Sequence, residues 1–99
     1  MTYRLTFLKS AKKEWDQLPS LIQKQLKNKL LKIIHTPHIP KNKLVGLEDC
    51  YKIKLRASGY RLVYRVDENR ITVQVIGIGK RDKGDIYQIV YHRLSLEPS

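Results

Sequence analysis

The sequence predicts one α+β domain, in which helices pack on a mainly antiparallel four-stranded sheet in the order β-α-α-β-β-β-α. Three observations support this fold class. Apolar and polar residues alternate near the N-terminus and again in the second half, as in half-buried strands. Between these regions apolar residues recur every three or four positions, as on a helix, and this spacing returns near the C-terminus. The 99 residues fit a single domain.

The first predicted elements are a short strand and a helical hairpin. The segment TYRLTF alternates polar and apolar residues, so its apolar side chains share one face of a strand. Helical spacing then covers about residues 9–18 and 20–35. Pro19 separates the two helices because proline does not fit a helix interior, and Ser20 can cap the second. The second helix is expected to end before Pro37, so an N-terminal helical hairpin packs on the sheet.

Two strands and a tight turn follow a loop. Residues 36–48 contain two prolines and a glycine and are predicted to form that loop. Residues 50–56 and 60–66 then alternate as strands on either side of Ser58-Gly59, which suits a two-residue hairpin turn.

The last strand and helix complete the predicted fold. The segment VDEN reverses the chain into a strand at 70–79, which is apolar on both faces, as a central strand would be. Helical spacing then predicts a final helix over about 82–93. Residues 95–99 follow it as a loose tail of the single domain 1–99.

The charge of the chain is strongly positive. Twenty Lys and Arg residues against nine Asp and Glu give a net charge of +11 and a pI near 10. A field of this size attracts polyanions, of which nucleic acid is the commonest in a cell. The alternative is that the lysines only solubilise a small surface. An even scatter of charge would favour that alternative, but the charge is concentrated in the predicted hairpin.

The hairpin strands carry cations on one face and no acidic residue. Lys52, Lys54 and Arg56 alternate with apolar residues, and Arg61 and Arg65 do so on the partner strand. The predicted turn sets Arg56 opposite Arg61 and Lys52 opposite Arg65. Like charges facing each other across a ladder destabilise it. An external anion such as a phosphodiester backbone would relieve the repulsion, although a solvated basic face stays open as an alternative.

Several classes of site are excluded by missing motifs. Cys50 is the only cysteine, so no intrachain disulfide can form, and the three histidines lack the spacing of metal ligands. GIGKRDKG lacks the Ser or Thr of a phosphate-binding loop and the third glycine of the dinucleotide fingerprint. We therefore expect no metal and no cofactor. Without a signal peptide or a long apolar run, we expect a soluble cytoplasmic protein that does not bind membranes.

A cationic site can still cleave RNA, because RNA carries its own nucleophile, the 2′-OH. Arginine can hold phosphate oxygens through two parallel bonds, and lysine acts as a point charge. A lysine crowded by cations loses its proton more easily, so Lys52 or Lys54 could serve as the base. Tyr87, in the last predicted helix, could stack on a base or position the 2′-OH. From the residues alone, an ordinary, partly exposed helix tyrosine is the favoured interpretation.

Three segments of the chain closely resemble the RelE toxins of bacterial toxin–antitoxin systems. They are AKKEWDQLPSLIQKQLKNKL, KNKLVGLEDCYKIKLRASGYRLVYRV and VIGIGKRDKGDIY. The string YKIKLRxSGYRLVY is long and specific, and the likeness extends to about residue 94. The resemblance implies the same order of elements. It also implies a metal-independent endoribonuclease that enters the ribosomal A site and cleaves mRNA to 2′,3′-cyclic phosphate and 5′-OH ends.

The resemblance also implies roles for five residues. Lys52 and Lys54 would abstract the proton and stabilise charge. Which of the two lysines is the base stays open. Arg61 would steady the phosphate in the transition state. Arg81 would act at the leaving oxygen, more by its charge than as an acid, because guanidinium holds its proton above about pH 12. Tyr87 would orient the substrate. We expect the four cations of this set to converge on one concave surface.

Other cations are expected to contact RNA or the ribosome: Lys41, Lys43, Arg56, Arg65, Lys80 and Lys83. Lysines of the helices would contact ribosomal RNA or form a solvated face: Lys12, Lys13, Lys27, Lys29 and Lys32. The resemblance implies a RelB-like antitoxin partner that is acidic or amphipathic, beside the ribosome and mRNA. It leaves open whether a toxin–antitoxin complex binds its own operator DNA. Two other functions stay open: translation block by occupancy alone, and gyrase inhibition as in the ParE branch, which lacks this cationic set.

Overall fold

The structure, a computed structural model, describes residues 2–80 and 85–96. Its elements are β1 (Arg4–Phe7), α1 (Lys9–Asp16), α2 (Ser20–Ile33), the short 3-10 helix η1 (Pro40–Asn42), β2 (Cys50–Leu55), β3 (Tyr60–Asp67), β4 (Thr72–Lys80) and α3 (Ile86–Leu96). The predicted fold class and order of elements are confirmed. The turn η1 lies within the predicted loop. No helix of the described ranges has both the length and the apolar character needed to cross a membrane.

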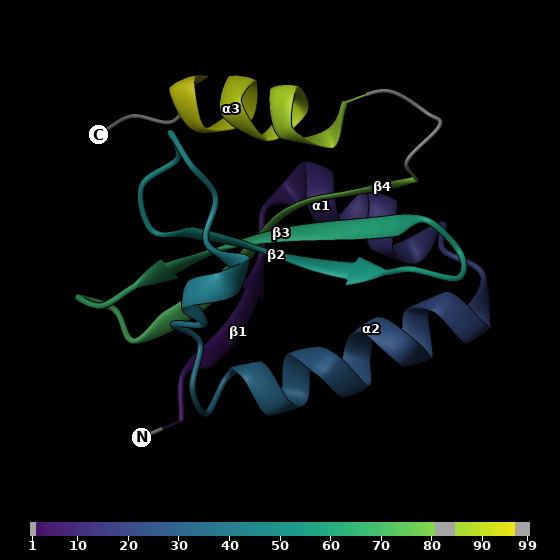
Figure 1. Cartoon of the computed structure of the whole chain (residues 1–99), viewed down its shortest axis with the longest axis horizontal. Coiled ribbons are helices and arrows are strands. Elements are labelled where there is room, and N and C mark those ends of the chain that lie inside the picture. The colour runs from purple at the N-terminus through teal and green to yellow at the C-terminus, as the bar shows by residue number, and fades with distance from the viewer. Residues whose placement is uncertain (1, 81–84, 97–99) are drawn as a thin grey trace.

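The strands form one four-stranded sheet in the order β1-β4-β3-β2. β1 runs parallel to β4, and the other two pairs are antiparallel. The helical hairpin of α1 and α2 covers one face of the sheet, and α3 crosses the other face (Figure 1). This arrangement makes β3 and β4 central strands and leaves β2 at an edge.

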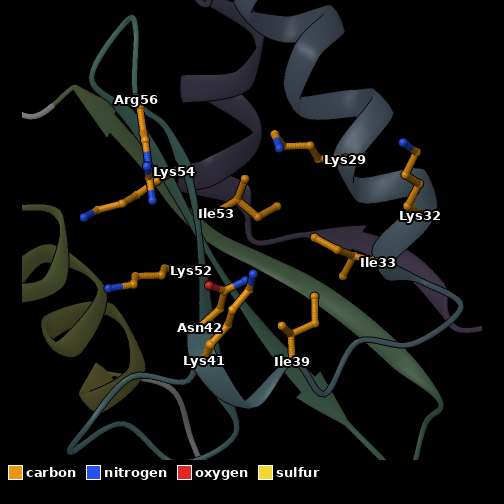
Figure 2. A pocket seen from close by; sticks show the side chains of 10 residues that line it. All are labelled: Lys29, Lys32, Ile33, Ile39, Lys41, Asn42, Lys52, Ile53, Lys54 and Arg56. Carbon is orange, nitrogen blue, oxygen red and sulfur yellow. The ribbon is translucent and has the colours of Figure 1, made fainter.

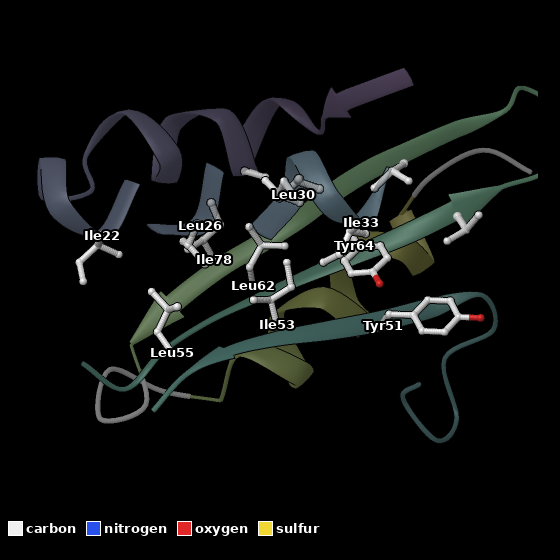
Figure 3. Packing of buried hydrophobic residues seen from close by; sticks show 14 residues of the cluster. Ile22, Leu26, Leu30, Ile33, Tyr51, Ile53, Leu55, Leu62, Tyr64 and Ile78 are labelled. Atoms are coloured by element: carbon white, nitrogen blue, oxygen red, sulfur yellow. The ribbon is translucent and has the colours of Figure 1, made fainter. Parts of the chain in front are cut away.

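The larger core lies between the sheet and the α1–α2 hairpin. Leu26 and Leu30 of α2 are fully buried against Leu62 and Tyr64 of β3 (Figure 3). The Tyr64 ring stacks on Tyr51, with ring centroids 5.5 Å apart, and its hydroxyl donates a hydrogen bond of 2.9 Å to the Pro37 carbonyl oxygen. This core therefore also ties down the loop that follows α2.

A second, smaller core lies between the sheet and α3. It consists of Cys50, Val63, Ile76, Ile86 and Val90. A β-bulge in β4 makes this two-sided packing possible, because the register changes from Val63 opposite Gly77 to Tyr64 opposite Val75. The extra residue, Ile76, faces α3 while Val75 faces the larger core. The predicted two-sided character of this strand is confirmed.

The predicted two-residue hairpin turn is wrong. Leu55 pairs with Tyr60, so four residues, 56–59, form the loop between β2 and β3. Gly59 closes it with φ of 79° and donates its N–H to the Leu55 carbonyl oxygen at 2.8 Å. A left-handed glycine near the end of a longer hairpin loop is a common alternative to the two-residue turn.

The longer loop changes the cross-strand pairs. Lys54 lies opposite Arg61, whereas Lys52 lies opposite the apolar Val63 and Arg65 lies opposite Cys50. The predicted pairs of Arg56 with Arg61 and of Lys52 with Arg65 are therefore wrong. Each partner moves by two positions, so every side chain keeps its predicted face of the sheet.

Helix ends also differ from the predicted boundaries. α1 and α2 each end two residues early, at Asp16 and Ile33. α3 begins at Ile86, because Asp85 is a non-helical residue whose carboxylate accepts the Tyr87 N–H at 2.9 Å. The predicted start at about 82 lies outside the described residues. α3 continues to Leu96, so the first two residues of the predicted tail belong to the helix.

Candidate functional site

One row of the sheet brings predicted site residues together. Lys54 in β2, Arg61 in β3 and Gly79 in β4 are register partners across three strands. Ile86 of α3 sits over Gly79, at 3.4 Å from where a Cβ would be. The guanidinium carbon of Arg61 lies 5.8 Å from the centroid of the Tyr87 ring. The row therefore joins two predicted cations to the predicted aromatic residue.

Tyr87 is held at the start of α3. Its backbone N–H is bound by Asp85, and the neighbouring Ile86 is buried against the sheet. The Tyr87 side chain is half-buried and packs on the smaller core. A guanidinium near an aromatic ring is attracted by the ring's negative face, which helps to orient Arg61. The two side chains thus form one unit at the edge of the α3 core.

Lys52 occupies the adjacent row. It is half-buried and faces Val63 across the ladder, and Val63 in turn faces Gly77. Figure 2 shows the Lys52 and Lys54 side chains leaving β2 on the side of α3. Neither of these two rows contains an acidic residue. A phosphate bound here would meet cations on one side and the Tyr87 ring on the other.

A basic groove of about 600 Å³ extends from these rows across the edge of β2 toward α2 (Figure 2). Lys29 and Lys32 of α2 line it on the side away from α3. Its floor is partly apolar, with Ile33, Ile39 and Ile53. The cations that line the groove are Lys29, Lys32, Lys41, Lys52, Lys54 and Arg56. A chain of phosphates could follow this surface away from Arg61.

Two predicted RNA contacts lie away from the rows. Arg65 donates to the Gln74 side-chain oxygen at 2.7 Å, and it lines a hollow together with Asp49 and Glu68. Lys80 pairs with Tyr60 on the face of the larger core, with its amine 5.9 Å from the centroid of the Tyr60 ring. Neither side chain faces the space between Arg61 and Tyr87. Their contacts with RNA stay predictions.

Of the remaining predicted residues, one lies beside the groove and two lie outside the described residues. Lys43 is exposed and forms an isolated β-bridge with Tyr51, just beyond the basic groove. Arg81 and Lys83 lie outside the described residues. The expected convergence of Arg81 with Lys54 and Arg61 therefore stays a prediction.

A chain of hydrogen bonds lies near the turn between β3 and β4, at the end of β3 away from Arg61. His38 contacts the Tyr51 hydroxyl at 3.0 Å and binds the Glu68 carboxylate, which also accepts from the Tyr3 hydroxyl at 2.9 Å. These bonds, first that from His38, lower the pKa of the Glu68 carboxyl. The chain fastens the loop after α2 to the sheet, a structural role. No group of three or more His, Cys, Asp or Glu side chains within residues 2–80 and 85–96 could hold a metal ion.

Cys50 is fully buried in the smaller core. Burial raises the pKa of its thiol to about 11, and the nearby Arg65 offsets this only in part. The thiol therefore stays protonated at neutral pH. A protonated, inaccessible thiol is a poor nucleophile, so Cys50 takes no part in the candidate chemistry.

Sequence reasoning missed a pair of charged residues, Glu14 and Arg93. They are 79 positions apart and form a two-pronged ion pair beside β4. A signal was present, since Glu14 lies three residues after the buried Ala11 and Arg93 three after the buried Val90. A charge on the buried stripe of a helix usually has a partner.

Comparisons with known proteins show the family to which this chain belongs. A family model described as the ParE toxin of the type II toxin–antitoxin system parDE matches residues 5–84. The mRNA interferase toxin RelE of Escherichia coli K12 is 48% identical over 94 residues, which cover 95% of this chain and 99% of the relative. The mRNA interferase RelE of Shigella flexneri matches equally well.

Solved structures give the same relationship. A mutant of E. coli toxin RelE in the free state superposes with a TM-score of 0.87 at 47% identity, covering 95% of this chain and 99% of that one. The toxin in the intact E. coli RelBE toxin–antitoxin complex has a TM-score of 0.79 at 51% identity, covering 82% and 99%. The chain therefore belongs to the RelE toxins of bacterial type II toxin–antitoxin systems, within the superfamily that RelE shares with ParE.

Proposed function

We propose that this chain is the toxin of a toxin–antitoxin pair and a ribosome-dependent endoribonuclease that cleaves translated mRNA in the A site. The observation that carries the proposal is the row of Lys54 and Arg61, with Tyr87 against Arg61. Relatives named mRNA interferase RelE add support. Cleavage of translated mRNA inhibits translation, and the site of action is the cytoplasm, where ribosomes work.

The proposed reaction needs no group beyond the RNA and the protein. The 2′-oxygen attacks the adjacent phosphorus, which forms the 2′,3′-cyclic phosphate and breaks the bond to the 5′-oxygen. A lysine takes the proton of the 2′-OH, and the departing 5′-oxygen gains one to become a 5′-OH. Arg61 holds the non-bridging phosphate oxygens, whose charge grows in the transition state. Arg81 stabilises the leaving oxygen, and Tyr87 orients the nucleotide.

The register favours Lys54 over Lys52 as the base. Lys54 lies directly across from Arg61, which holds the phosphate, whereas Lys52 lies across from Val63 in the next row. A base must reach the 2′-OH beside the same phosphate, so the residue nearest Arg61 is better placed. Lys52 then stabilises the developing charge.

The basic groove supports a path for RNA on either side of the scissile phosphate. Arg56 and Lys41 extend the cationic surface past the edge of β2, and Lys29 and Lys32 continue it along α2. Cations spaced along a groove bind a phosphate backbone in any sequence. Ribosomal RNA and mRNA are both proposed to meet this surface, and the remaining helix lysines would meet ribosomal RNA.

A RelB-like antitoxin is the proposed partner that keeps the toxin silent. Structures of relatives contain such pairs, among them the E. coli RelBE complex. The net charge of +11 suits an acidic or amphipathic partner. Such a protein could cover the cationic rows or displace α3 by packing its own apolar face on the sheet.

The second candidate function is translation block by occupancy. It rests on the same cations, since a basic surface binds RNA whether or not it cleaves. Charge-preserving substitution separates the two functions. Arg81→Lys keeps the net charge, so affinity for RNA should change little, yet cleavage should fall if the guanidinium fork acts in the transition state. Inhibition of gyrase, the activity of the ParE branch, would show as toxicity without any effect on purified translation.

The nature of the cut ends tests the chemistry. We would incubate the toxin with ribosomes carrying an mRNA that has one 2′-deoxynucleotide on the 5′ side of a mapped cut. Loss of that cut alone, with 5′-OH ends at the remaining cuts, is the expected result. A cut that persists at the deoxynucleotide and leaves a 5′-phosphate would contradict attack by the 2′-OH. Arrested translation with intact mRNA would favour occupancy.

A further inference from the structure

The edge of β4 beside β1 is covered by strand pairing over only part of its length. β1 pairs with β4 from Thr72 to Val75, and the last backbone bond runs from the Leu8 N–H to the Val75 carbonyl oxygen at 2.9 Å. The chain then turns into α1. Within the described part of the chain, no strand pairs with 76–80 on this side.

Side chains take the place of the missing strand. One carboxylate oxygen of Glu14, in α1, accepts the Ile78 N–H at 3.1 Å. The guanidinium of Arg93, in α3, donates to the Ile76 carbonyl oxygen at 2.9 Å. Backbone groups without a partner are costly in a protein interior, so this edge needs both side chains. An acceptor from one helix and a donor from another complete it.

The two side chains also bind each other. Arg93 Nη1 lies 2.8 Å from Glu14 Oε1, and Arg93 Nη2 lies 2.9 Å from Glu14 Oε2. Their exposed fractions are only 18% for Arg93 and 28% for Glu14. Two parallel charge-assisted bonds fix direction as well as distance, and low exposure limits screening by water. The pair therefore links α1, β4 and α3 at one point.

α3 needs a directional restraint of this kind. Only Ile86 and Val90 of this helix are buried. They lie over Gly77 and Gly79, which present no side chain. Two further side chains of α3 pack beside them, partly buried. Apolar contact is non-directional, so these side chains hold α3 down without fixing its rotation as directional bonds would. Arg93 lies seven residues after Ile86, on the same face of the helix.

We propose that Glu14 and Arg93 are positioning residues, which set the rotation and axial position of α3 and so hold Tyr87 against Arg61. The proposal rests on the proposed function, in which Tyr87 orients the RNA. Neither Glu14 nor Arg93 touches the substrate. They act through the helix that carries Tyr87, whose ring lies beside the Arg61 guanidinium.

The test compares Arg93→Lys and Glu14→Gln with the wild type in single-turnover cleavage on programmed ribosomes. Arg93→Lys keeps the charge but loses the fork, and Glu14→Gln keeps the shape but loses the anion. We expect the cleavage rate at saturating toxin to fall roughly ten- to hundredfold, because small misplacements are costly in catalysis. The toxin concentration that gives half the maximal rate should change little. The proposal would be overturned if the loss of cleavage came instead from weaker ribosome binding, with an unchanged rate at saturating toxin.

Asp16→Asn is the matched control. It breaks the exposed ion pair of Lys12 with Asp16 on the same helix, where both side chains are more than half exposed. We expect cleavage within about twofold of the wild type, since exposed pairs contribute little. A loss as large as that of Glu14→Gln would mean that α1 tolerates no change, and would overturn the specific role of the pair.

A Tyr87→Ala background separates positioning from a general structural role. If the pair acts through Tyr87, Arg93→Lys should cause little further loss in this background, whereas independent roles would give multiplied losses. Multiplied losses would overturn the proposal. If Tyr87→Ala cleaves at the wild-type rate, the site assignment under the proposed function fails instead.

A measurement that does not depend on cleavage distinguishes failure of the positioning role from failure of the proposed function. Cys50 is buried in the core beneath α3, so its rate of alkylation in the native protein reports how firmly α3 is seated. Arg93→Lys should raise this rate severalfold, and Asp16→Asn should leave it unchanged. An unchanged rate in Arg93→Lys would overturn the positioning role, whatever the protein does to mRNA.

Discussion

The two faces of the sheet are packed to different depths. Among the residues that the structure describes, the cluster under α1 and α2 contains fourteen buried residues, whereas the cluster under α3 contains five. The row of Lys54 and Arg61 lies on the α3 side, beside the smaller cluster. A row of like charges destabilises a sheet, and the larger cluster on the opposite face supplies burial that offsets this cost. The same strands can therefore fold through one face and act through the other.

The largest expected effect is on stability, from a cavity in the larger core. Leu62→Ala should lower the free energy of unfolding by about 2–5 kcal/mol, because Leu62 is fully buried under α2. Ile86→Ala in the smaller core should lower it less, because α3 can detach locally. Urea denaturation followed by the fluorescence of Trp15, which packs on the larger core, measures both. Equal losses would contradict the division between the faces.

The next largest effect is a loss of cleavage activity with little change in the stability of the fold. Arg61→Gln should reduce cleavage by roughly 10²–10³-fold, the usual result of removing one preorganised charge donor. Its urea midpoint should stay near that of the wild type, since the substitution relieves a like-charge pair. Arg70→Gln removes the same charge from an exposed turn residue and should leave cleavage nearly unchanged. A similar loss in both variants would reduce the role of Arg61 to bulk charge.

A smaller effect is expected where α3 meets β4. A Cβ at Gly77 would lie 3.1 Å from Ile86, Val90 and Arg93, so Gly77→Ala should push α3 outward by a few tenths of an ångström. We expect a roughly tenfold fall in the cleavage rate from the displaced Tyr87. At Gly79 the nearest atom would lie at 3.4 Å, an ordinary contact, so Gly79→Ala should do less. The reverse order would mean that the seating of α3 does not control the site.

The smallest effect concerns the pH dependence of Cys50. Because its pKa is raised to about 11, only about a thousandth of the thiol is ionised at pH 8. Alkylation of the native protein should be negligible at pH 8 and rise as the pH approaches 11. Urea should abolish the difference, since the unfolded thiol regains an ordinary pKa. Fast native alkylation at pH 8 would mean that the smaller core is open to solvent.

The sequence predicted the features that depend on which residues face the cores, and it missed some that depend on how the elements meet in space. The order of elements and the face of each strand residue follow from apolar spacing, and both are confirmed. The turn between Leu55 and Tyr60 was predicted too short, because Gly59 suits both a two-residue and a four-residue loop. Apolar spacing predicts which face of the sheet each strand residue occupies, and this prediction was correct. Which residues pair across the two strands, such as Lys54 with Arg61, depends on the loop length.

The site shows a similar limit. The residues on strands, Lys52, Lys54 and Arg61, were placed on one face by period-two alternation. Whether Tyr87 would meet Arg61 depends on how α3 lies on the sheet, which is set by Gly77, Gly79 and a tie between residues 79 positions apart. No local pattern encodes that geometry. The only sign of this tie in the sequence was a charged residue at a helix position that is expected to be buried.

The most direct test of the central claim is 5′-end mapping of a defined mRNA in a purified translation system, with and without ribosomes. The wild type should produce cuts in phase with codons, and only when ribosomes are present. Arg61→Gln should produce almost none while still binding ribosomes. Translation arrest with intact mRNA, or cuts that are equally strong in naked RNA, would contradict the account of the α3 face as a ribosome-dependent nuclease site.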